Sequence, residues 1–505
     1  MARRPIGWWS GVALAGCGLL GVGSGQPKPA TQPAEQAPAP AKVPAAPVFD
    51  SREVFPADTE VLDIDLPTAL RLANAGNPTI ALARQRVAEA YARLRQAQLV
   101  VLPDLQLTPS YLRHDGRIQN SAGVVFDTDK SSVYGTGGAV LSLNTGDALF
   151  GPLIARRLAE AQAANSAGVN NNVLLDVALA YLDLLQGYGQ LAVNANLLDR
   201  DRELLRRTEE VTKAGLAPTG ADINRARAEV QLRIAERIAI KGQIRVASSR
   251  LARLLLLRAT VGLVPAEPAI VPVVLVPETD SADDLVAVGV ATRPELAEGR
   301  SLVAASEARL RQVRLSPLLP RLDFSYNAGT FGGGQESFVG NFGGRGDGAV
   351  SLVWDLRNLG LGNAALNRVQ RIQVGEANLY VAEVQARVAD EVNTALQIAR
   401  ARREALDSAQ EAVRQAAETF RKLDELSFGT TGPKRELNTV EPLLAIQALA
   451  QARVQYLNAV IDYNRAQFQL FTAMGRPSLE ALPKATPAPV AVPVAPGPYR
   501  PPPRQ

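Results

Sequence analysis

The spacing of proline constrains this chain most strongly. No proline occurs between Pro152 and Pro218, or between Pro320 and Pro433. Within these tracts, residues 151–214 and 364–426 carry a helical pattern. At 1.5 Å per residue, each helix would be about 95 Å long, too long to be covered by one compact domain. We therefore expect the two helices to pack against other long helices, in this chain or in further copies of it.

The second long helix has a heptad pattern. Apolar residues recur every seven positions, and a second, incomplete series of mostly alanine accompanies them. The main series is Val392, Ala399, Leu406, Val413 and Phe420. Small residues at such positions allow helices to approach closely, so the pattern predicts long packed helix pairs.

Four short segments alternate apolar and polar residues with the period of a β-strand. They are expected at 103–113, 133–143, 320–328 and 348–356. One apolar set in each segment would form one face; these sets are Leu105, Leu107, Pro109 and Tyr111; Val133, Ala139, Leu141 and Leu143; Leu322, Phe324, Tyr326 and Ala328; and Val350, Leu352, Trp354 and Leu356. This pattern suits a membrane strand with one lipid face and one wet face, although a half-exposed soluble sheet would also explain it. Because four strands cannot close a membrane barrel, spanning would require several chains to share one.

The body of the chain contains two sequence repeats. The pentapeptide ARLRQ occurs at 92–96 and again at 308–312, and LPDL after the first copy matches LPRL after the second. Each half predicts a short helix at 66–75 or 285–292, a helix of about 20 residues, two strands and two long helices. The chain is predicted to consist, in order, of a signal peptide at 1–16, a Pro/Ala-rich linker at 17–55 that begins at a lipidated Cys17, a first repeat at 56–263, a connector at 264–284, a second repeat at 285–477, and a Pro-rich disordered tail at 478–505.

The N-terminus predicts export and lipid attachment. Arg3 and Arg4 precede a short apolar stretch that ends in Leu14-Ala15-Gly16-Cys17, which resembles a bacterial lipobox. The chain has one cysteine, and it occupies the position that lipidation requires. Gly18 rather than aspartate follows it, which favours the outer membrane. The alternative is an ordinary signal peptide with a coincidental cysteine.

Composition excludes several classes of function. A net charge of +4 over 505 residues, without a basic run, gives no footprint for nucleic acid. The single cysteine excludes a disulfide framework and a cysteine zinc site, and the single histidine, His114, excludes paired-histidine metal sites and disfavours a histidine-based triad. His114 is expected to be exposed. The tripeptide Arg345-Gly346-Asp347 is interpreted as a chance match to an adhesion motif. Enzyme activity is therefore not expected.

With these features together, the chain resembles the TolC-type outer-membrane efflux protein family over about residues 60–477. The resemblance rests on the duplicated ARLRQ helices with LPDL and LPRL, the two-strand insertions, the long helices, and a glycine turn into each last helix. It implies a mainly α protein with membrane β-structure. Three chains would form a 12-stranded β-barrel, four strands from each, above an α-helical barrel. It also implies a passive exit duct for efflux or type I secretion, in the outer membrane with a long periplasmic portion, that uses a periplasmic adaptor protein and an inner-membrane pump and needs no cofactor.

The resemblance further implies a gate at the periplasmic tip. The turns at 213–220 and 428–437 would dock the adaptor; their matched residues are Gly215, Leu216, Gly429 and Gly432. Gate positions fall on Asp222, Arg435, Asn438 and Glu441. Asp222 and Asn438 could instead cap helices, and Arg435 and Glu441 could be solvated surface. The alternative to a duct is a periplasmic or surface coiled-coil scaffold lipoprotein without a pore.

Overall fold

The computed structural model describes residues 53–213, 220–267, 269–336, 338–428 and 440–481, all of which belong to one compact unit. In the first half of this unit the elements are α1 (Leu66–Gly76), α2 (Pro78–Leu99), β2 (Asp104–Gln119), β3 (Val125–Asn144), α3 (Thr145–Lys213) and α4 (Gly220–Leu254). In the second half they are α5 (Ala282–Thr292), α6 (Pro294–Leu315), β5 (Arg321–Gln335), β6 (Gly343–Val353), α7 (Leu361–Phe428) and α8 (Val440–Ala473).

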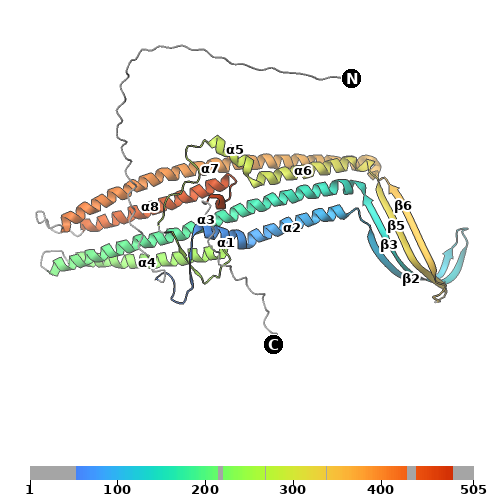
Figure 1. The fold of residues 1–505 in the computed structure, drawn as a ribbon, viewed down its shortest axis with the longest axis horizontal. Coiled ribbons are helices and arrows are strands. Elements are labelled where there is room, and N and C mark those ends of the chain that lie inside the picture. Colours follow the sequence, from blue (N-terminus) through green and yellow to red (C-terminus); the bar gives the residue numbers. More distant parts are fainter. Residues whose placement is uncertain (1–52, 214–219, 268, 337, 429–439, 482–505) are drawn as a thin grey trace, which may run out of the picture. The chain divides into compact units, whose positions relative to one another are not determined.

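The two halves follow the same order with matching helix lengths. α1 and α5 each have 11 residues, α2 and α6 each have 22, α3 and α7 have 69 and 68, and α4 and α8 have 35 and 34. α3 runs beside α4, and α7 beside α8 (Figure 1). Short 3-10 helices lie at Ser316–Leu318, Arg357–Gly360 and Ser478–Ala481.

Local sequence signals fix where the short helices begin. The Asp65 carboxylate accepts a hydrogen bond of 2.8 Å from the Thr68 amide and caps α1. The Asn77 side chain accepts a bond of 2.9 Å from the Thr79 amide, and Pro78 then begins α2. Ser281 caps α5 through the Asp284 amide at 3.1 Å. These side chains satisfy helix amides that have no partner within the helix, which separates each short helix from the preceding segment.

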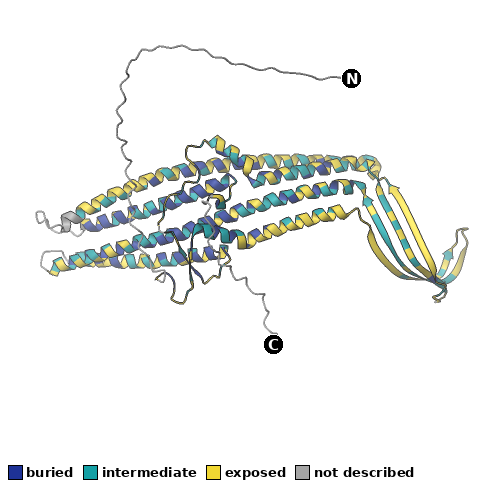
Figure 2. Ribbon diagram, in the orientation of Figure 1, coloured by how far each residue is buried: buried dark blue, intermediate teal, exposed yellow. Residues whose placement is uncertain are grey.

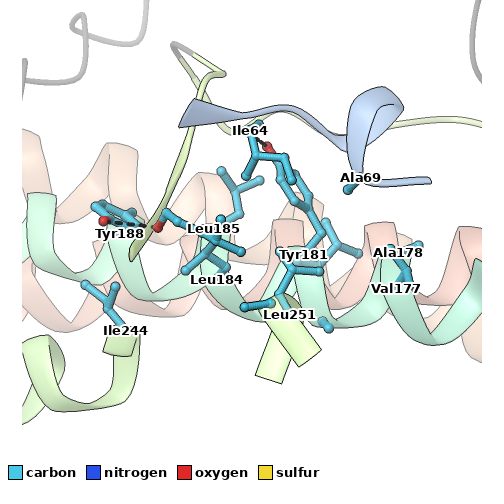
Figure 3. Close-up of a cluster of buried hydrophobic side chains, with 14 of the residues drawn as sticks. Ile64, Ala69, Val177, Ala178, Tyr181, Leu184, Leu185, Tyr188, Ile244 and Leu251 are labelled. Atoms are coloured by element: carbon cyan, nitrogen blue, oxygen red, sulfur yellow. Dashed lines mark hydrogen bonds between the residues drawn. The ribbon is translucent and has the colours of Figure 1, made fainter. Parts of the chain in front are cut away.

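The main core surrounds the middle of α3. Tyr181, Leu184 and Leu191 on α3 are almost completely buried against residues of α1, α4 and α8. Figure 2 shows the buried middle of α3, and Figure 3 shows Tyr181 and Leu184 among their neighbours. The Tyr181 hydroxyl donates to the carbonyl oxygen of Ile64 at 3.2 Å, so the ring is buried without an unsatisfied polar atom. Since each fully buried side chain of this size contributes about 1.5–3 kcal/mol, this cluster anchors the long helices at their midpoints.

The heptad pattern is confirmed along the middle part of α7. Val388, Val392, Ala399 and Leu406 are all buried, and most of them pack against α5 and α8. Farther along the helix, Val413 is only half-buried. The pattern therefore identifies the helix face that forms the second core.

The structure also contains a strand pair that the sequence did not predict. β1 (Val61–Ile64) pairs in parallel with β4 (Gly262–Pro265), which lies at the start of the predicted connector. Beyond β4, the buried side chains of Asn464 and Gln467 on α8 bind the connector's main chain. The Val273 amide donates to Asn464 at 2.7 Å, and the amides of residues 275 and 276 donate to Gln467 at 3.1 and 3.0 Å. The connector is therefore a fixed part of the core.

Several predicted boundaries are wrong. α3 begins at Thr145, seven residues before Pro152, so Pro152 lies inside the helix, where it removes a main-chain hydrogen bond without ending the helix. β2 and β3 extend into the predicted loop, because polar residues there continue the pairing. β6 covers 343–353 rather than 348–356.

Candidate functional site

Four antiparallel strands form one sheet in the order β2-β3-β5-β6. Within the described chain, β2 pairs only with β3, and β6 pairs only with β5, so both outer strands have an open edge. The register places residues in rows across the sheet. Leu143 lies opposite Leu322, which lies opposite Leu352; Leu141, Phe324 and Val350 form the next row. Because side chains alternate between faces along a strand, every member of a row shares a face.

One face of this sheet is apolar from edge to edge. The four alternating sets that the sequence predicts all fall on it, except Trp354 and Leu356, which follow the end of β6. Leu105 and Leu107 are 86% and 88% exposed. On β3 the apolar band covers 133–143, about 33 Å of strand at about 3.3 Å per residue. A tilt of about 45° converts this length to roughly 25 Å, the height of the apolar band of a membrane barrel.

The opposite face is predominantly polar. Its residues include Gln106, Thr108, Ser110, Thr136, Ser142, Asn144, Arg321, Asp323, Ser325, Asn327, Arg345, Asp347 and Ser351. The Ser142 hydroxyl donates to Asp323 at 2.6 Å, and Arg321 also binds that carboxylate at 3.0 Å. A sheet with one fully apolar face and one wet face can separate hydrocarbon from water.

Glycines on the polar face allow the main chains of adjacent strands to approach closely on that side. A Cβ on Gly138, Gly329 or Gly333 would lie 2.1–2.3 Å from a main-chain oxygen of the adjacent strand. All three positions belong to the polar face. Such crowding on one side means that the sheet curls with the polar face inward, and glycine in a strand is the usual device for sharp curvature.

An aromatic and charged cluster on the polar face was missed by the sequence analysis. The rings of Tyr134 and Phe331 lie 5.0 Å apart, and the Arg345 guanidinium is 5.5 Å from both. Arg345 also donates to Asp347 at 2.8 Å. The tripeptide Arg345-Gly346-Asp347 therefore lies in β6 with its charged residues paired to each other. Only the cross-strand register could have revealed this cluster.

The apolar face ends in charges at the β2–β3 hairpin. Arg113 contacts Asp129 at 2.9 Å, and Arg117 contacts Asp127 at 3.4 Å. These residues continue the odd-numbered series that is apolar from Leu105 to Tyr111. His114 lies between them in the sequence and is half-buried rather than exposed, which corrects the prediction. The hairpin thus marks one boundary of the apolar band.

At the other ends of the long helices, only part of the predicted tip lies within the described residues. Asp222 is in the first turn of α4, with a carboxylate oxygen 3.7 Å from Arg225. Glu441 is exposed in the first turn of α8. Both positions place negative charge near a helix N-terminus, where the helix dipole stabilises it. The residues outside the described ranges are Cys17, Gly215, Leu216, Gly429, Gly432, Arg435 and Asn438.

Ion pairs link the four long helices near the ends of α4 and α8. Arg465 on α8 contacts Asp183 on α3 at 2.5 Å and Asp462 at 2.8 Å. Asp183 also lies 3.7 Å from Arg250 on α4, and Asp462 lies 3.3 Å from Arg402 on α7. The sequence could not predict this network, because its members are far apart in the chain.

Nearer the tip, Asp201 on α3 is buried 3.4 Å from Arg233 on α4. Burial raises the pKa of Asp201, and the nearby Arg233 opposes that rise. The pair lies between α3 and α4. Within the described ranges, no group of three or more histidine, cysteine, aspartate or glutamate side chains could hold a metal ion. Among the described helices, none is both long and apolar enough to cross a membrane.

The arrangement of these elements is the fold of outer-membrane channel proteins. The outer-membrane channel OprN superposes with a TM-score of 0.65 at 18% identity, over 85% of this chain and 96% of that one. CusC, described as forming a transmembrane channel, gives 0.65 at 18% identity over 83% and 94%. The open state of the MtrE outer-membrane channel of Neisseria gonorrhoeae gives 0.64 at 17% over 81% and 89%.

Sequence comparison adds no further assignment. No family model matches the chain, and no curated protein matches it. The likeness to solved structures therefore establishes the fold. At that level, the resemblance to the TolC-type family is confirmed.

Proposed function

We propose that this protein is an outer-membrane exit duct, a passive channel for efflux or type I secretion. The observation that carries the proposal is the four-stranded sheet, with an exposed apolar face, a concave polar face and two open edges. Unpaired strand edges cannot face lipid, so each edge must pair with a strand of another copy. The fold shared with outer-membrane channels supports this reading and disfavours a scaffold without a pore.

Three copies satisfy these requirements best. Two copies would supply eight strands, and side chains would nearly fill the interior of such a small barrel. Three copies supply 12 strands, an even number as membrane barrels require, and leave a wet lumen. The long helices of the same three copies would enclose the periplasmic continuation of the tube. We infer that the two halves of each chain arose by duplication, because they supply equivalent helix pairs and strand pairs.

The partners follow from the channel's lack of an energy source. A periplasmic adaptor and an inner-membrane pump would drive transport, and no catalytic group, cofactor or nucleic acid would take part. The docking surface would be the helix-connecting turns that contain Gly215, Leu216, Gly429 and Gly432. Substitutions in both turns should abolish adaptor binding while the purified protein keeps its oligomeric state. Intact binding would remove the docking role.

We assign the gate to Asp222, Arg435, Asn438 and Glu441, at the tip of the two helix pairs. Asp222 and Glu441 would contribute negative charge around the aperture, and Arg435 would help hold it shut. Replacement of Arg435 by serine should raise single-channel conductance in planar bilayers. A channel with unchanged conductance would place the gate elsewhere, and a protein that never conducts would refute the duct itself.

We also propose that Cys17 carries lipid and anchors the mature chain in the outer membrane. Cells grown with labelled palmitate should label the wild-type protein and not a Cys17→Ser variant. Because the sheet would still span the membrane, the variant should remain able to form channels in vitro. Label on the serine variant would refute the assignment.

A further inference from the structure

The junction between β6 and α7 has an unusual surface. Trp354, Leu356, Leu359 and Leu361 all expose more than half of their area, and we call residues 354–361 the junction segment. Leu359 is 96% exposed, and Leu361 is 76% exposed. Single exposed leucines are common, but four large apolar side chains within eight residues form a patch that water does not favour.

The backbone of this segment is strained in a way that keeps Leu359 exposed. Asn358 and Leu359 have φ angles of 50° and 57°, and Gly360 follows at 87°. Asparagine and glycine adopt this left-handed region readily, whereas leucine does so at a cost. A strained residue that is almost fully exposed makes no packing contact that offsets the strain within the chain. The patch therefore has the features of a contact that forms outside this chain.

The junction segment is present in only one half of the protein. In the first half, β3 ends at Asn144 and α3 begins at Thr145, with no residue between them. In the second half, residues 354–360 separate β6 from α7. Since α3 and α7 match in length, the extra residues are an insertion between β6 and α7 in the second half. Helix packing therefore does not require them.

The segment continues the apolar face of the sheet. Trp354 follows Leu352 by two residues, so it extends the even-numbered apolar series of β6 past the end of the strand. The opposite end of the apolar band has the charged β2–β3 hairpin. Tryptophan is favoured where hydrocarbon meets lipid headgroups. Continuity with the lipid face thus indicates that the membrane covers this patch.

We propose that the junction segment inserts into the lipid boundary of the inner leaflet, with Trp354 and Leu359 as its anchors. The inference rests on the proposed function, because it requires the sheet to span the outer membrane. It adds a membrane anchor, the junction segment, that positions the end of the sheet at the membrane surface. Contact with a second copy of this chain would be the competing explanation for the exposed residues.

Tryptophan fluorescence in vesicles of brominated phosphatidylcholine tests the proposal. The protein has three tryptophans, and removal of the proposed signal peptide, which contains Trp8 and Trp9, leaves only Trp354 in the mature chain. Vesicles brominated near the headgroup should remove about half of the Trp354 emission, because an interfacial ring lies within reach of the bromine. Bromine near the acyl ends should quench it less.

Two further variants, both made with Trp354 replaced by phenylalanine, decide whether lipid or protein covers the junction segment. Leu359→Trp should be quenched as Trp354 is. Leu379→Trp is the matched control, because Leu379 is also a strongly exposed leucine but lies farther along α7. It should not be quenched. A conducting Leu359→Trp channel without quenching, or equal quenching of the two variants, would overturn the proposed lipid insertion of the junction segment. Neither result would contradict the proposed channel function. Absence of conductance would instead contradict the proposed function.

Discussion

At the residue scale, the strain at Leu359 yields a direct prediction about stability. Leu359→Gly should stabilise the protein in detergent by about 1–2 kcal/mol, because glycine adopts a left-handed backbone without the penalty of a Cβ. Leu361→Gly is the control, since Leu361 has an ordinary helical φ of −65° and glycine there should destabilise. Apparent melting temperatures of the two variants measure the difference. Equal destabilisation would mean that the strain at Leu359 is negligible.

A second residue-scale prediction concerns Glu267, which accepts a hydrogen bond from the Leu66 amide and whose other carboxylate oxygen contacts the Tyr181 hydroxyl. Burial raises the pKa of Glu267, an effect that the Leu66 amide partly opposes. A raised pKa in the folded protein means that this group contributes stability below its unfolded pKa, about 4.3. That contribution is lost as pH rises through the folded pKa.

Melting curves across this pH range test the point. The wild type should lose a component of stability as pH rises above about 4.3, and Glu267→Gln should lack that component. Glu203→Gln is a suitable control, because Glu203 is on the surface and arginine hydrogen bonds lower its pKa. If the Glu267 variant keeps the full pH dependence, the carboxyl group is not responsible.

Sequence alone predicts some residues well and others not at all. The alternation of apolar and polar residues identified the apolar face, because every second side chain of a strand lies on the same face. The register then placed those residues in rows across the sheet. The left-handed Leu359 carries no signal, since leucine rarely adopts that backbone. Arg345, Tyr134 and Phe331 come together only through cross-strand pairing, so their cluster could not be seen without the register.

At the element scale, glycine within the strands supports the curl of the sheet. Gly329→Val should prevent assembly of a stable sheet, because its Cβ would lie 2.1 Å from the Gly135 carbonyl oxygen. Overpacking usually costs about 1–3 kcal/mol, and a Cβ this close to a main-chain oxygen should cost at least the upper value. Gly346→Val, in the next strand, is the control, since its nearest neighbour would be 3.7 Å away. Comparable assembly of both variants on gels would contradict the proposed curvature.

The connector provides another test at this scale. Gln467→Leu would leave the amides of Leu275 and Val276 without their acceptor and should cost about 1–3 kcal/mol. Hydrogen exchange at those amides should accelerate. Gln469→Leu, at an exposed position on the same helix, should change neither quantity. Unaltered exchange in the first variant would show that the connector is held by other contacts.

Element type was predictable where periodicity was long, as in α3 and α7. Boundaries were less predictable, because α3 continues through Pro152 and polar residues continue the β2–β3 pairing. The β1–β4 pair was missed since each strand has only four residues. Such short strands have no usable pattern, and their pairing depends on residues far apart in the chain.

At the scale of the whole molecule, a membrane channel requires the open edges of β2 and β6 to meet in an assembly. Single-particle imaging of the purified protein in mild detergent tests this most directly. We expect three copies around a hollow axis, with the polar sheet faces toward that axis. A single copy, or an assembly whose centre is filled along its length, would contradict it.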